Sequence, residues 1–217
     1  MSDNGNTLLQ PLRGVVMFAA LLSGASCHAG TVISEVFYDA EGADNGLVFV
    51  ELFGLPGTVL DGYMLMGVNG NDGVVYRNVA LTGKIPADGI FVVADDRGDG
   101  TSLVAHADLV AEVDLQNGPD SIVLRDAATV LDALGYGDFL AGVFAGEGRA
   151  AADVSAGNSL ARIDPRVDGN DNLADFRMLT SPSPGALDAA TVPLPPALVL
   201  FVSGIAGLIG FGRRTRK

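Results

Sequence analysis

Short stretches in which apolar and polar residues alternate, rich in β-branched and aromatic side chains, dominate the first two thirds of the chain. A period of two is typical of half-buried β-strands, and the clusters of Gly, Pro, Asn and Asp between the stretches are typical of turns. The pattern predicts strands at 31–38, 47–52, 63–68, 74–81, 90–94, 121–125 and 130–135.

Two pairs of these strands are separated by short turn sequences, which indicates β-hairpins. The turn at 69–73 follows the strand 63–68, and the strand 130–135 is expected to pair with 121–125. Because no long stretch has the helical period of 3.6, the pattern predicts an all-β sandwich.

The burial of individual residues can also be predicted. Much of 47–52 is apolar on both sides, so this strand is expected to be buried on both faces, and Phe49 and Phe91 are expected in the core. From 138 to 187 the chain is rich in Gly, Asp and Pro, and it is expected to be mostly irregular. Isolated apolar residues should pack this region down, namely Leu160, Ile163, Phe176 and Leu179.

The N-terminal segment is typical of a secretory signal peptide at 1–29. Arg13 precedes an apolar stretch, and small residues lead to an expected cleavage after Ala29. Cys27 also suggests a lipoprotein site, but Gly24 stands where leucine is expected, which favours cleavage after Ala29.

The C-terminal segment has three parts. The domain is expected at 30–187, and a linker that begins within 181–185 leads to a proline-stiffened motif, an apolar stretch at 197–212 and a basic tail at 213–217. As a transmembrane helix the apolar stretch would span about 24 Å, close to the roughly 30 Å of a bilayer core. The motif, within 188–196, is Val192, Pro193, Leu194, Pro195 and Pro196, and the stop-transfer cations are Arg213, Arg214, Arg216 and Lys217.

This order of parts resembles the PEP-CTERM class of sorting signals, in particular its VPLPA-type variant, from which the extra Pro196 is a small departure. The resemblance implies that an exosortase-like membrane protease-transpeptidase recognises and cleaves the tail. The alternative is a plain membrane anchor, which needs the apolar helix and the cations alone.

Charge and cysteine content narrow the possible functions. The formal net charge is −13 and the sequence pI is about 4.3, and so acidic a surface repels phosphates and argues against nucleic-acid binding. It suits a secreted protein that meets divalent cations or stays soluble at the cell surface. Cys27 is the only cysteine and lies in the leader, so the domain is expected to hold its fold without a disulfide.

Little in the sequence supports catalysis. His106 is the only histidine outside the leader, which argues against a Cys–His nucleophile or a multi-histidine zinc site. Glu35 and Glu51 could form an acid/base pair. Because both lie inside predicted strands, we favour a structural role, in which one or both bind backbone donors or an arginine at an edge of the sandwich.

Two acidic loops could bind Ca²⁺, which takes roughly six to eight oxygen ligands in flexible geometry. The loop 95–100 and the loop 164–171 place carboxylates and amides next to glycines. The alternative is an ordinary solvated turn, because Asp and Gly are common turn residues. The candidate ligands are Asp95, Asp96, Asp99, Asp168, Asn170 and Asp171.

A second resemblance covers most of the remaining chain. The sequences at 34–36, 49–52, 85–94, 120–126 and 159–162, followed by 171–176 and 181–185, resemble the bacterial lamin tail domain in order and spacing. The resemblance implies an immunoglobulin-like β-sandwich that acts as a binding or scaffolding module and carries no catalytic residues. Relatives often have Gly-Trp where this chain has Gly62-Tyr63, and the substitution keeps an aromatic ring.

Together these features predict an exported, non-catalytic surface or extracellular-matrix module. It would pass through the export machinery, stay in the inner membrane as a precursor, and reach the cell surface or medium after exosortase-type processing. By resemblance alone, its partner is an exopolysaccharide or another surface protein, and no nucleic acid or obligatory cofactor is expected. The alternative function is a metal-dependent extracellular hydrolase.

Overall fold

The computed structural model describes residues 30–139 and 142–187. The expected signal peptide, sorting motif, transmembrane helix and basic tail therefore lie outside the described residues. None of the helices in the described ranges is long and apolar enough to cross a membrane.

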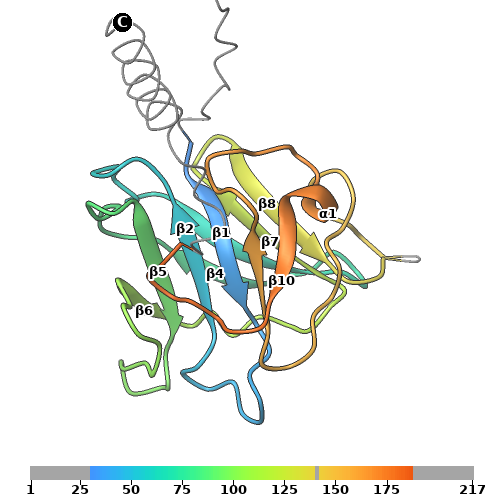
Figure 1. Cartoon of the computed structure of the whole chain (residues 1–217), viewed down its shortest axis with the longest axis horizontal. Helices are drawn as coiled ribbons and strands as arrows, with labels where there is room; N and C mark the ends of the chain where they lie inside the picture. Colours follow the sequence, from blue (N-terminus) through green and yellow to red (C-terminus); the bar gives the residue numbers. More distant parts are fainter. Residues whose placement is uncertain (1–29, 140–141, 188–217) are drawn as a thin grey trace, which may run out of the picture.

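Two stacked β-sheets form the domain, as the alternating pattern predicted (Figure 1). One sheet has six strands in the order β10-β9-β1-β2-β5-β6, and its neighbours are antiparallel except β5 and β6, which are parallel. Its strands are β1 (Val32–Phe37), β2 (Phe49–Phe53), β5 (Ile90–Asp95), β6 (Leu109–Ala111), β9 (Ser159–Arg162) and β10 (Phe176–Leu179).

The second sheet has four antiparallel strands in the order β4-β3-β7-β8. Both predicted hairpins are confirmed, since β3 pairs with β4 and β7 pairs with β8. A single short helix, α1 (Asn172–Asp175), packs near β8 and β10 in the described part of the chain (Figure 1). The strands are β3 (Met64–Asn69), β4 (Val75–Ala80), β7 (Asp120–Arg125) and β8 (Val130–Tyr136).

The main hydrophobic core fills the space between the sheets. Leu52 and Phe91 from the six-stranded sheet and Ile122 and Leu134 from the four-stranded sheet belong to it, and all are almost fully buried. Because side chains alternate between the two faces of a strand, every second residue of β2 and β7 enters this core. Phe91 is thus a core residue, as predicted.

A second apolar cluster lies on the outer face of the six-stranded sheet. Phe49, Ile90 and Val92 form it, and Val104 and Leu187 pack over it from later segments of the chain. Phe49 is buried, and β2 is buried on both faces as predicted. The outer face is therefore a covered surface.

Three strands and the helix were missed by the sequence pattern. β6 has three residues, and β9 and β10 have four each, so none is long enough to establish an alternating pattern. Leu160 and Phe176 are buried as expected, whereas Ile163 is exposed because it follows the last residue of β9.

Candidate functional site: an acidic pocket and two buried carboxylate clusters

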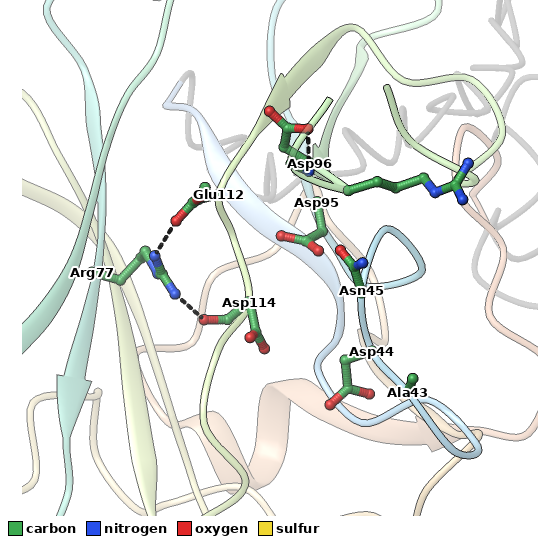
Figure 2. Close-up of a pocket in the computed structure, with 10 residues that line it drawn as sticks. Ala43, Asp44, Asn45, Arg77, Asp95, Asp96, Glu112 and Asp114 are labelled. Atoms are coloured by element: carbon green, nitrogen blue, oxygen red, sulfur yellow. Dashed lines mark hydrogen bonds and ion pairs between the residues drawn. The ribbon is translucent and has the colours of Figure 1, made fainter. Parts of the chain in front are cut away.

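A pocket of about 380 Å³ lies where three segments meet beside the four-stranded sheet. The loop between β1 and β2, the end of β5 with its following loop, and the segment after β6 form its walls. In Figure 2 the acidic side chains of these segments surround one space. The lining residues are Ala43, Asp44, Asn45, Arg77, Asp95, Asp96, Arg97, Gly98, Glu112 and Asp114.

Arg77 of β4 fixes one wall of the pocket (Figure 2). Its Nη1 lies 2.9 Å from Oε2 of Glu112, and its Nη2 donates a hydrogen bond of 3.2 Å to the backbone carbonyl of Asp114. Burial, together with the charges of Asp95 and Asp44, raises the pKa of Asp114. The pocket therefore holds five carboxylates and two guanidinium groups, those of Arg77 and Arg97, and its formal charge is negative.

Asp95 and Asp96 hold the other walls. Asp95 is buried and accepts hydrogen bonds from the backbone N–H of Gly46 at 2.8 Å and of Val113 at 3.2 Å, so it links the end of β5 to the other two segments. Asp96 accepts from the N–H groups of Gly98 and Gly100, both at 2.8 Å, through Oδ1 alone. Both predicted metal ligands thus shape the pocket, and Asp96 keeps one oxygen for a ligand.

The third candidate ligand of the first loop lies outside this pocket. Asp99 is exposed and uses Oδ1 to accept hydrogen bonds from Thr101, at 2.9 Å from the backbone N–H and 2.6 Å from the hydroxyl. These bonds lower the pKa of Asp99. The structure therefore brings Asp95 and Asp96 together in one pocket and leaves Asp99 on the loop surface.

The candidate ligands of the second loop are directed toward two different arginines. Asp168 lies 3.3 Å from Nη1 of Arg162, and Asp171 lies 2.7 Å from Nη2 of Arg149. Asn170 has a positive φ of 51°, typical of a tight turn. Calcium binding at either loop stays a prediction.

A buried charge cluster surrounds Arg162. Oxygens of Asp132, Glu147 and Asp168 lie within 4.8 Å of one another, a spacing that a metal ion could bridge. The Arg162 guanidinium, however, lies 2.7 Å from Asp132 and supplies positive charge there. Burial and the charges of Asp132 and Asp168 raise the pKa of Glu147 to about 8.

The last cluster is formed by Glu35 and Glu51, which lie opposite each other on β1 and β2. Each accepts a hydrogen bond from a backbone N–H, so the predicted binding of backbone donors is confirmed. Their position differs from the prediction, because β1 and β2 are inner strands of the sheet and not an edge. Burial raises the pKa of Glu51 to about 7.

Several residues of these clusters carried no recognisable signal in the sequence. Asp44, Arg77 and Asp114 come from three separate segments, and only the fold brings them together. Glu147 lies in an irregular segment without a motif. Arg162 belongs to a stretch shared with the lamin tail resemblance, which was the one available signal.

The comparisons with known proteins add no relative. No protein-family model matches the chain, and no curated protein matches its sequence.

Proposed function

We propose that this chain is an exported, non-catalytic surface or matrix module that binds an exopolysaccharide in its acidic pocket and carries a C-terminal sorting signal. The two-sheet sandwich supports the immunoglobulin-like fold that the lamin tail resemblance implies. A module of this kind uses a rigid sandwich to present loops to a partner.

The observation that carries the proposal is the pocket itself. Backbone hydrogen bonds fix one oxygen of Asp44 and one of Asp96, and each carboxylate keeps a second oxygen that can accept from a sugar hydroxyl. Asn45 adds an amide with both donors and an acceptor. Fixed polar groups around one cavity suit a ligand rich in hydroxyl groups.

The non-catalytic reading is supported by what the buried carboxylates already do. Glu51 and Glu35 are covered and accept hydrogen bonds from serine hydroxyls and backbone N–H groups. Asp132 is bound by Arg162 through both oxygens, at 2.8 and 2.7 Å. A general acid or base needs access to its substrate, which these three residues lack.

The sorting role is supported by the short distance along the chain between the domain and the expected helix. Nine residues, 188–196, follow Leu187 and span at most about 30 Å when fully extended. In the membrane-bound precursor the domain would thus stay close to the bilayer surface, where a membrane protease can reach the proline motif.

The binding proposal is tested with the purified full-length protein on an array of bacterial exopolysaccharides. A double variant, Asp44→Asn with Asp114→Asn, removes two charges of the pocket and keeps the side-chain shapes. We expect it to weaken binding by at least about tenfold, since hydrogen bonds to charged groups contribute roughly 1.5–3 kcal/mol each. Asp138→Asn is the matched control, because Asp138 is exposed and does not line the pocket.

Two outcomes would contradict the proposal. One is an absence of wild-type binding to every polysaccharide on the array. The other is a double variant that binds as well as Asp138→Asn, which would place the ligand elsewhere. Hydrolysis of a bound glycan by the wild-type protein would favour the alternative of a hydrolase.

A further inference from the structure

The segment 183–187, called the strap here, lies across the outer face of the six-stranded sheet. It was predicted as part of a linker, but Leu187 packs onto the cluster of Phe49, Ile90 and Val92. Gly185 has a φ of 80°, and a Cβ at this position would lie 2.6 Å from the Cβ of His106. The strap therefore packs closely against the rest of the domain.

Beneath the strap, Glu35 and Glu51 face each other from adjacent strands with only 2% and 1% of their surfaces exposed. Like charges directly opposite each other destabilise a sheet, and burial away from water adds to that cost. The environment must therefore compensate for this pair.

Hydrogen bonds from the strap provide part of that compensation. The backbone N–H and the hydroxyl of Ser183 donate to Glu35, at 3.0 and 2.8 Å, and the N–H of Gly185 donates to Glu51 at 2.9 Å. Glu35 also accepts from the hydroxyl of Ser159 at 2.6 Å, and Glu51 is bonded to the hydroxyl of Ser34 at 2.8 Å.

The two carboxylates differ in the number of donors that face them. Glu35 receives three, and both of its oxygens accept. In the structure Glu51 accepts both of its bonds, one from the hydroxyl of Ser34 and one from the N–H of Gly185. A proton on the oxygen that faces Ser34 reverses the direction of that bond, so that a neutral Glu51 donates to the Ser34 hydroxyl and keeps both contacts. One proton on Glu51 thus removes the repulsion without losing a hydrogen bond.

The charged groups around Glu51 favour that proton. Glu35 on β1 and Asp88, in the turn before β5, both act on Glu51 with negative charge. A small cavity under the strap is lined by Glu35, Glu51 and Arg162 of β9, but the guanidinium of Arg162 is bound to Asp132. His106 lies beside Gly185, and the strap itself has no titratable side chain.

We propose that the strap is a proton-controlled latch, which stays on the sheet while Glu51 is neutral and detaches when Glu51 ionises. Detachment returns water to both carboxylates and uncovers the apolar cluster around Phe49. Burial, with the charges of Glu35 and Asp88, raises the pKa of Glu51 to about 7, so the latch opens as the pH rises through neutrality. The proposed latch involves only residues of the β-sandwich domain and does not require the function proposed above.

The test uses a fluorescent reporter in the full-length protein, which has no tryptophan. In Leu187→Trp, we expect blue emission at pH 5 and red-shifted emission at pH 8.5, with a midpoint near pH 7, while the far-UV circular dichroism stays unchanged. Glu51→Gln in the same background should abolish the shift, because Gln keeps both hydrogen bonds and cannot ionise. Glu147→Gln is the control that should retain it, since Glu147 also titrates in this range.

Hydrogen exchange of the wild-type protein gives a second measurement without a reporter. A group that titrates at about 7 when covered and at about 4.5 when free should weaken docking by up to roughly 70-fold between pH 5 and pH 8. Protection of the amides in 183–187, corrected for intrinsic exchange rates, should fall accordingly. Protection that is independent of pH, or an equal fall in Glu51→Gln, would overturn the latch.

Discussion

Arg162 and Asp132 connect the two sheets through a fully buried ion pair, with Nη2 of Arg162 lying 2.7 Å from Oδ2 of Asp132. Asp132 belongs to β8 and Arg162 to β9, and both also bond the backbone of Ile33 on β1, at 2.6 and 3.0 Å. The guanidinium lies 4.6 Å from the centre of the Phe176 ring. Four strands therefore depend on one charged side chain.

We expect Arg162→Met to destabilise the protein by about 3–5 kcal/mol, because it leaves Asp132 buried without its counter-charge. The measurement is the free energy of unfolding in urea for the purified protein. The double variant Arg162→Met with Asp132→Leu should recover part of the loss, since it removes the buried charge of Asp132 but still leaves Asp168 and Asp175 without their ion pairs to Arg162.

Arg149→Met is the matched control for this prediction. Arg149 pairs with Asp171 at 2.7 Å, but its side chain is largely exposed, so we expect little change in stability. Equal effects of the two arginine substitutions would mean that the buried pair has no special structural role.

A second prediction concerns Glu147 and the dependence of stability on pH. Because its pKa is raised from 4.5 to about 8 in the folded protein, folded Glu147 retains a proton that the unfolded chain has released. The free energy of unfolding should therefore fall as the pH rises from about 4.5 to about 8, and level off above it. Glu51 contributes in the same direction up to about pH 7.

Urea unfolding at intervals from pH 5 to pH 9 measures this dependence. Glu147→Gln should have a shallower slope than the wild-type protein from about pH 5 to about pH 8, and between pH 7 and pH 8, where Glu51 is largely ionised, most of the remaining slope should disappear. The same slope in both proteins would show that Glu147 is ionised in the folded state at neutral pH.

The alternating pattern predicted much of the sandwich because most strands bury at least one face against the core. Both hairpins and the burial of Phe49 and Phe91 followed from local sequence alone. The alternating pattern did not predict β9, because its four residues Ser159–Arg162 include a buried arginine, which a hydropathy pattern assigns to the surface. Only the partner Asp132, 30 residues earlier in the chain, explains its burial.

The candidate sites were harder to predict from the sequence than the strands. Acidic loops next to glycines suggest metal ligands, but the same residues form turns, and Asp96 and Asp99 do bond to the backbone N–H groups of their own loop. Glu35 and Glu51 lie 16 residues apart, so their opposition depends on the strand register and its bulge. The local sequence pattern does not predict that register.

A third prediction tests calcium binding at the two acidic loops. A ligand that binds the folded state alone stabilises it by about 2.7 kcal/mol at 100 times its dissociation constant. With a dissociation constant of about 0.1 mM, the tighter end of the range for extracellular calcium modules, we expect the melting temperature of a protein of this size to rise by about 5–10 °C in 10 mM Ca²⁺ relative to chelator. NaCl at matched ionic strength is the control, because screening alone relieves repulsion in so acidic a chain.

Single substitutions in each loop show which loop causes the rise in melting temperature. Asp96→Asn should abolish it if the pocket loop binds, and Asp171→Asn should do so if the second loop binds, since each removes one charged ligand oxygen. Equal melting temperatures in calcium and in the NaCl control would reject both sites.

The last prediction concerns the tail. A permanent anchor needs only an apolar helix and cations, so the prolines of the motif should matter only if an enzyme reads them. We expect Pro193→Ala with Pro195→Ala to insert normally but to remain full-length in the inner membrane, whereas Pro56→Ala, on an exposed loop of the domain, should be processed like the wild type. The measurement is C-terminal mass spectrometry of protein recovered from the surface of the native host. An intact Lys217 on the mature wild-type protein would show that the tail is a simple membrane anchor. That outcome would not bear on the proposed latch at Glu51, because the residues of the latch lie within the domain.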